Sequence, residues 1–238
     1  MTISTRYTLN PAVGDPRDWS FTWGLHDDVR LESCCDFCGQ SEQRMTYQVA
    51  RGADEMWVCQ RCVGRYPISG AVNGQALDLR EARDHVHGLT ARLKQRTCYD
   101  IIRQVQVLSS DPALEEVLVY FDRNLMLSPQ RAALLFAALP QLAERVDVRI
   151  FEIQTRSKAH QEEFGAMDDA ARMLVWPALS AQQWRRLASL GHAPSSAVTK
   201  RGRFRPEFQI ELTGSRMSAL TAPAEPHRLE EKLLKPVI

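Results

Sequence analysis

The sequence has almost no excess of either charge: 30 Lys and Arg residues face 29 Asp and Glu residues, which gives a formal net charge of +1. Net charge therefore provides no general attraction to nucleic acid or to an anionic membrane, and an anion-binding role must come from local clusters of cations. Long apolar runs are also missing. The longest, 132–143, is interrupted by Pro140, and the N-terminus has no signal-peptide pattern. We expect a folded cytoplasmic protein that does not contact membranes.

The chain has six cysteines, and a reducing compartment argues against disulfides for them. Two residues separate Cys35 from Cys38, two separate Cys59 from Cys62, and twenty lie between the pairs. Four thiolates at this spacing can complete the shell of one tetrahedral zinc ion and leave no open position. We therefore predict one structural Zn2+ ion on these four cysteines, with two pairs of buried, reduced cysteines as the alternative. Cys34 could replace Cys35, but it would lengthen the first spacing to three residues.

The segment between the cysteine pairs predicts a β-hairpin. Residues 44–58 alternate between apolar and polar side chains on both sides of a turn at 51–54. Gly39 and Gly64, which follow the two pairs, are expected to supply the positive φ angles of two metal-binding knuckles. A zinc ribbon would result.

Two further patterns flank this ribbon. The sequence WSFTW, at 19–23, alternates like a strand, and its aromatic rings would either pack in a core or stack on bases. Residues 76–108 are rich in Leu, Arg, Glu and Gln and contain no proline, which favours one long helix or two shorter ones.

A strand–helix–strand unit is predicted next. Residues 117–121 form an apolar run typical of a buried strand, Ser128 and Pro129 begin a helix to about Arg145, and 146–153 alternate like a second strand. If the strands are parallel, the loops that follow them share one edge of the sheet, where ligands bind in α/β folds; an antiparallel pairing would separate the loops. The polar side chains of the two loops are candidate nucleic-acid contacts: Arg123, Asn124, Arg156, Ser157, Lys158 and His160.

Near the C-terminus, Ser180 and Gln183 predict a capping box at the start of a helix that ends at Gly191. A helical hairpin is expected there, and a DNA-reading helix-turn-helix is the alternative. The segment that follows has four cations and one aromatic ring within six residues, a composition that can bind phosphates and stack on a base, or simply form a solvated loop. Its candidate contacts are Lys200, Arg201, Arg203, Phe204 and Arg205.

Together these patterns predict an α+β protein in which an N-terminal zinc ribbon joins a mixed α/β and helical body. The expected segments are an N-terminal strand segment (1–33), the zinc ribbon (34–66), a helical segment (67–112), the strand–helix–strand unit (113–160), the helical hairpin with its basic segment (161–221) and a mobile tail (222–238).

The order of three features resembles the large subunit of type IV CRISPR effector complexes. They are the four-cysteine site (CDFCG with CQRCVG), a strand that leads into a Thr/Ser/Lys/His loop (RIFEIQTRSKAH), and a late helix that ends in glycine before a basic segment (WRRLASLGHAPSSAVTKRGRF). The three features span most of the chain. In the family the loop is richer in glycine, near Ser-Gly-Gln-Lys-His, whereas Arg156 and Ala159 occupy part of it here.

The resemblance implies a non-enzymatic, zinc-binding subunit that joins the backbone and other subunits of an effector complex used in antiviral or anti-plasmid defence. It would contact CRISPR RNA and the duplex DNA flanking the target, while base pairing with the RNA reads the sequence. The alternative is a stand-alone zinc-ribbon factor for transcription or plasmid maintenance, which would bind DNA without RNA. An enzyme is not expected, because no nucleophile, phosphate loop or open metal site accompanies His160.

Overall fold

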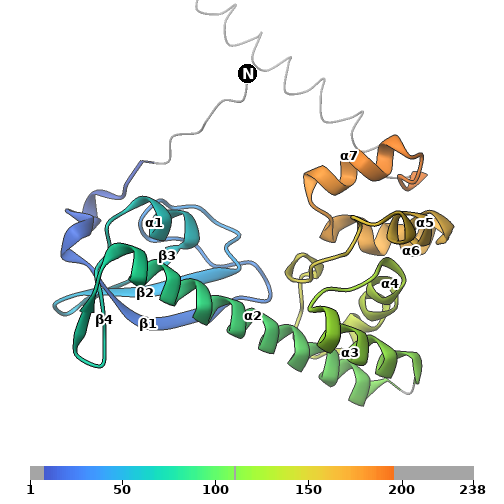
Figure 1. The fold of residues 1–238 in the computed structure, drawn as a ribbon, viewed down its shortest axis with the longest axis horizontal. Helices are drawn as coiled ribbons and strands as arrows, with labels where there is room; N and C mark the ends of the chain where they lie inside the picture. Colours follow the sequence, from blue (N-terminus) through green and yellow to red (C-terminus); the bar gives the residue numbers. More distant parts are fainter. Residues whose placement is uncertain (1–7, 110, 196–238) are drawn as a thin grey trace, which may run out of the picture. The chain divides into compact units, whose positions relative to one another are not determined.

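The computed structural model describes residues 8–109 and 111–195, where antiparallel strands come first and helices follow (Figure 1). The strands are β1 (Ser20–Asp27), β2 (Met45–Arg51), β3 (Asp54–Cys59), β4 (Gly70–Val72) and β5 (Gln75–Leu77). The α-helices are α1 (Gln60–Arg65), α2 (Leu79–Leu108), α3 (Ala113–Asn124), α4 (Pro129–Ala138), α5 (Lys158–Ala166), α6 (Asp169–Val175) and α7 (Ala181–Ser189). The 3-10 helices are Pro11–Val13, Pro16–Asp18, Leu139–Gln141, Val148–Ile150 and Trp176–Ala178. The expected α+β class is confirmed.

The predicted hairpin is present as strands β2 and β3. They pair antiparallel from Arg51 opposite Asp54 to Thr46 opposite Cys59, and Gly52 takes a φ of 61° in the turn. Strand β1 pairs antiparallel with the other side of β2, which gives a sheet of order β1–β2–β3. The hairpin therefore carries Cys59 at the end of its second strand.

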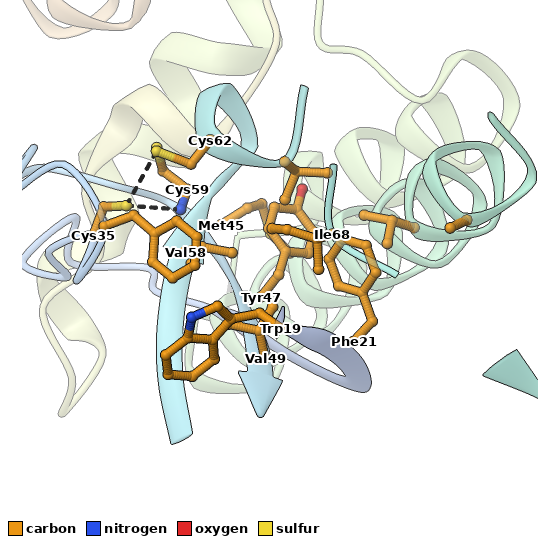
Figure 2. Packing of buried hydrophobic residues seen from close by; sticks show 14 of the residues in the cluster. Trp19, Phe21, Cys35, Met45, Tyr47, Val49, Val58, Cys59, Cys62 and Ile68 are labelled. Carbon is orange, nitrogen blue, oxygen red and sulfur yellow. Dashed lines mark hydrogen bonds between the residues drawn. The ribbon is translucent and has the colours of Figure 1, made fainter. Parts of the chain in front are cut away.

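The aromatic residues of the first strand pattern pack in a core. Trp19 is fully buried and Phe21 is nearly so, and both belong to one hydrophobic cluster with Tyr47 and Val49 of β2 (Figure 2). The indole N–H of Trp19 donates to the carbonyl oxygen of Val13 at 2.9 Å. These two rings are therefore core residues, as one of the two sequence interpretations had it.

A small hairpin, β4–β5, was not predicted. Its turn is Asn73-Gly74, and both residues have positive φ angles, 53° and 80°. Asn-Gly between two short strands is the strongest short-range hairpin signal, because both residues tolerate the left-handed region. The Asn-Gly pair is therefore the sequence signal from which this hairpin could have been predicted.

The long helix α2 joins the sheet to the helices that follow. Asp78 caps it, in a capping box with Glu81, and it continues for 30 residues as one helix. Near its start, Ala82 and Val86 belong to the hydrophobic cluster of the sheet. Its last turns run beside α3 (Figure 1), where Val105 is fully buried. A single helix thus contributes to two regions of the core.

The prediction that 117–121 form the first strand of a strand–helix–strand unit is wrong. This stretch lies inside helix α3. Leu114, Val117 and Phe121 are buried, whereas Val119 is 45% exposed. Buried positions three and four residues apart form one face of a helix, and this helical period overrides the strand preference of the apolar run.

The helix of this unit begins as predicted but ends early, and its second strand is also wrong. Ser128 and Pro129 open α4, which stops at Ala138 because Pro140 lies in a following 3-10 turn. Residues 146–153 contain the 3-10 helix Val148–Ile150 in place of a strand. Among the described residues of this region, strand-like pairing is limited to one parallel bridge between Leu127 and Ile153.

The later helix was predicted correctly. Ser180 and Gln183 form the capping box of α7, and Gly191 follows the helix with a φ of 77°. The basic residues from Lys200 to Arg205 and the tail beyond them lie outside the described residues. Within the described part of the chain, no helix combines the length and apolar character needed to cross a membrane.

Candidate metal centre and cleft

The structure brings together the four cysteines predicted as metal ligands. Their Sγ atoms all lie within 4.8 Å of one another. Cys35 and Cys62 approach to 3.7 Å, and Cys38 and Cys59 to 3.8 Å. Figure 2 shows the sulfur atoms of Cys35 and Cys62 facing each other at one end of the hydrophobic cluster.

These separations fit one tetrahedral ion and exclude disulfides. A disulfide holds its sulfurs about 2.05 Å apart. Zinc–thiolate bonds of about 2.3 Å in a regular tetrahedron place neighbouring sulfurs about 3.8 Å apart. The four cysteines could therefore hold a metal ion in a shell made entirely by the protein, which leaves no position for a substrate.

Local backbone geometry sets the first knuckle. The N–H of Gly39 donates to the carbonyl oxygen of Cys35 at 2.7 Å, and Gly39 has a φ of 67°. The N–H of Cys59 donates to the sulfur of Cys35 at 3.2 Å, which connects the two halves of the site. The expectation for Gly64 is wrong: it lies inside α1, because the second cysteine pair runs directly into a helix.

The pKa values of Cys59 and Cys62 are shifted in opposite directions by their interactions with Cys35. A hydrogen bond with the Cys35 side chain lowers the pKa of Cys59 to about 3, and the interaction with Cys35 raises the pKa of Cys62. One thiolate forms readily and makes ionisation of its neighbour costly. Several thiolates this close together require a cation to offset their repulsion.

Cys34 lies outside the cluster. It is exposed, and its thiol faces the carbonyl oxygen of Glu32 at 3.9 Å. The choice of Cys35 over Cys34 as the fourth member of the cluster is therefore confirmed.

Arg44, which sequence reasoning missed, connects the sheet to the chain beyond α2. Its guanidinium forms two hydrogen bonds with the carboxylate of Asp27, at 2.8 and 3.2 Å, and it also donates to the carbonyl oxygen of Ile150. The Arg44 and Asp27 side chains are 16% and 3% exposed. Burial alone would lower the pKa of Arg44, but the hydrogen bonds and charge of Asp27, together with the interaction with Cys98, raise it.

A second link starts from the loop after the first cysteine pair. Arg149 forms an ion pair with Glu42 of that loop at 3.0 Å and another with Asp147 at 2.9 Å. The N–H of Asp147 donates to the carbonyl oxygen of Val29 at 2.8 Å. The segment 147–150 is thus held against the cysteine-bearing part of the chain.

This segment leads into a cleft of about 990 Å³, whose lining combines apolar side chains with polar and basic ones. Three of the predicted nucleic-acid contacts, Arg156, Ser157 and His160, line one wall of the cleft. The first turn of α7 supplies another part of the lining, including Gln182 and Gln183, which sequence reasoning did not connect with this loop. The side-chain amide of Gln183 donates to the carbonyl oxygen of Ile153 at 2.7 Å and holds the two segments together.

Arg123, Asn124 and Lys158, the other nucleic-acid contacts predicted within the described residues, do not line this cleft. Arg123 and Asn124 line a separate hollow of about 650 Å³ next to α3. Tyr120 connects the two regions, since its hydroxyl donates to the side-chain oxygen of Gln154 at 2.8 Å and lies 3.5 Å from Nε2 of His160. The two loops are therefore neighbours, but through a helix side chain and not through a common sheet edge.

Lys158, the first residue of α5, is 88% exposed and forms an ion pair with Glu162 at 3.5 Å. Replacing Lys158 by alanine should weaken assembly or nucleic-acid binding and leave the melting temperature nearly unchanged, because an exposed pair of this kind contributes about 0–1 kcal/mol. Arg80→Ala is a matched control, since Arg80 forms an exposed pair with Asp84 on α2. A clear loss of melting temperature with binding intact would assign Lys158 to the fold.

No family model, curated protein or solved structure matches this chain.

Proposed function

We propose that the four cysteines bind one zinc ion, which closes a zinc ribbon built on β2, β3 and the two cysteine pairs. Two of the sulfur separations, 3.7 and 3.8 Å, support zinc, because they are close to the edge expected for a zinc–thiolate tetrahedron, about 3.8 Å. The ion would stabilise the fold and take no part in chemistry, since cysteine sulfurs fill all four positions.

We further propose that the chain is a non-catalytic subunit of a type IV CRISPR RNA-guided effector complex, in contact with CRISPR RNA and with duplex DNA flanking the target. The observation that carries this proposal is the set of polar and basic side chains in the cleft lining. Arg156, Ser157 and His160 come from the loop that underlies the resemblance, and they line the cleft together. A protein with a net charge of +1 needs such a local site to bind a polyanion.

Purification of the tagged full-length chain from its source cells tests this role. We expect RNA of uniform length and further protein subunits to co-purify, and ribonuclease treatment to release the subunits. Recovery of the chain without RNA would overturn the proposal. Sequence-specific binding of duplex DNA by the RNA-free chain, with a steep salt dependence, would favour a stand-alone DNA-binding factor instead.

A further inference from the structure

Two helices begin at the cleft. Ser157 and Ser180, the N-cap residues of α5 and α7, both line it. The first turn of a helix presents backbone N–H groups without intrahelical acceptors and carries a partial positive charge. Two such turns at one cleft form a stronger attraction for an anion than either turn alone.

The caps leave part of these N–H groups available. Ser157 accepts from the N–H of His160 at 3.2 Å, and Ser180 accepts from the N–H of Gln183 at 3.4 Å. The N–H groups at the first two positions of each helix find no acceptor within the described part of the chain: those of Lys158, Ala159, Ala181 and Gln182.

Thr155 provides an independent indication of a missing ligand. It lines the cleft, is 1% exposed, and its Oγ1 is buried without a hydrogen-bond partner among the described residues. Buried hydroxyl groups nearly always have a partner in folded proteins, so a bound ligand or an ordered water is expected to supply one to this atom.

The charges at the cleft favour an anion as that ligand. Arg156 and Arg186 are exposed and make no ion pair with any residue that the structure describes. The charge of Arg149 is already matched by Glu42 and Asp147. Glu152 is the single acidic residue of the cleft lining, so cations are in excess there.

We infer that the cleft binds a phosphate group of an RNA strand between the first turns of α5 and α7, with the hydroxyl of Thr155 as one donor. This inference rests on the proposed nucleic-acid role and names the part of the ligand that is held. A volume of about 990 Å³ exceeds the needs of one phosphate and leaves room for the attached nucleoside. Two helix N-termini, a buried hydroxyl and two unpaired arginines form a site suited to the phosphate and not to a particular base.

Binding of a fluorescent single-stranded RNA to the purified full-length chain, with inorganic phosphate as competitor, tests the site. Thr155→Val keeps the shape of the side chain and removes the hydroxyl. We expect it to lower RNA affinity about tenfold or more, the effect of one hydrogen bond to a charged group, and to weaken competition by phosphate. Its melting temperature should stay equal or rise, because an unpartnered buried hydroxyl is lost.

Arg156→Ala is the second variant, and it should reduce the slope of log affinity against log salt by about 0.7, the value for one phosphate contact on a single strand. Arg103→Ala, an exposed arginine of α2 outside the cleft lining, is the control for general loss of charge. The site is refuted if both cleft variants bind RNA and phosphate as the control does, or if the unmodified chain binds neither. Co-purification of cellular RNA with an unimpaired Thr155→Val variant would refute the phosphate site and leave the subunit role intact. Phosphate binding by the unmodified chain without co-purified RNA would support the phosphate site and overturn the subunit role.

Discussion

Replacing Cys35 by serine is expected to remove most of the bound metal and to destabilise the protein strongly. The purified chain should contain one equivalent of zinc, measured by elemental analysis, and the variant should contain well under half. Cys35 lies 3.7 Å from the sulfur of Cys62 and accepts the N–H of Cys59, so its loss opens the shell and removes the bond between its halves. Zinc binding contributes on the order of 10 kcal/mol to folding in small zinc fingers, and part of this energy should be lost here.

A loss of about 3 kcal/mol would lower the melting temperature of a chain of this length by about 6–12 °C. Cys62→Ser should behave in the same way, and a strong chelator should reproduce the effect in the unmodified protein. Cys34→Ser is the matched control: it is the same substitution one residue away, on an exposed side chain outside the cluster, and it should leave zinc content and stability unchanged. Full zinc occupancy with unchanged stability in the Cys35 variant would disprove the site.

Replacing Arg44 by alanine is expected to cost about 3–5 kcal/mol in the free energy of unfolding, because it leaves an uncompensated charge in the interior. Asp27 is only 3% exposed, and Arg44 provides both of its ion-pair contacts. The same substitution also removes the donor to the carbonyl oxygen of Ile150. Urea denaturation of the zinc-loaded protein measures this effect.

Two comparisons separate a buried charge from a general loss of packing. Arg96→Ala breaks an exposed ion pair with Asp100 and should cost only about 0–1 kcal/mol. Replacing both members of the buried pair, as Arg44→Met with Asp27→Leu, should recover much of the stability lost in the single variant, since no unpaired charge remains. A cost for Arg44→Ala no larger than that for Arg96→Ala would show that the buried pair is unimportant for folding.

Elements defined by local chemistry could be predicted from the sequence. The hairpin between the cysteine pairs depends on alternation and a glycine turn, and α4 and α7 depend on the residues that begin them, Ser128 with Pro129 and Ser180 with Gln183. The cysteine cluster belongs to the same group, because paired spacing on a hairpin brings the sulfurs together without distant contacts.

The incorrect predictions concern apolar stretches whose form depends on tertiary packing. Residues 117–121 suit a buried strand by composition, and only the burial of Leu114 together with Phe121 shows the helical face. Residues 146–153 alternate like a strand, yet Asp147 caps a 3-10 turn there and accepts from the N–H of Arg149. A short apolar run is compatible with both the helical and the strand period, and its secondary structure depends on packing against the rest of the fold.

The contacts of Arg44 with Asp27 and Ile150, and the cleft, could not be predicted from the sequence for another reason. Arg44 and Ile150 are 106 positions apart, and Gln183 and Ile153 are 30 apart. Neither pair contains a residue type that identifies its partner, since arginine and glutamine donate to any available carbonyl oxygen. His160 lines the cleft but Lys158 does not, and the role of α7 in forming the cleft depends on these long-range contacts.

The length of α2 has a consequence for how the protein opens. Its 30 residues span about 45 Å, and its two ends are held by different parts of the core. Gly88, the tenth residue of the helix, has nothing within 4 Å of where a side chain would begin, and glycine weakens a helix by about 1 kcal/mol relative to alanine. The helix can therefore exchange its amide protons as two cooperative units that meet near Gly88, each following the stability of the core region to which it belongs.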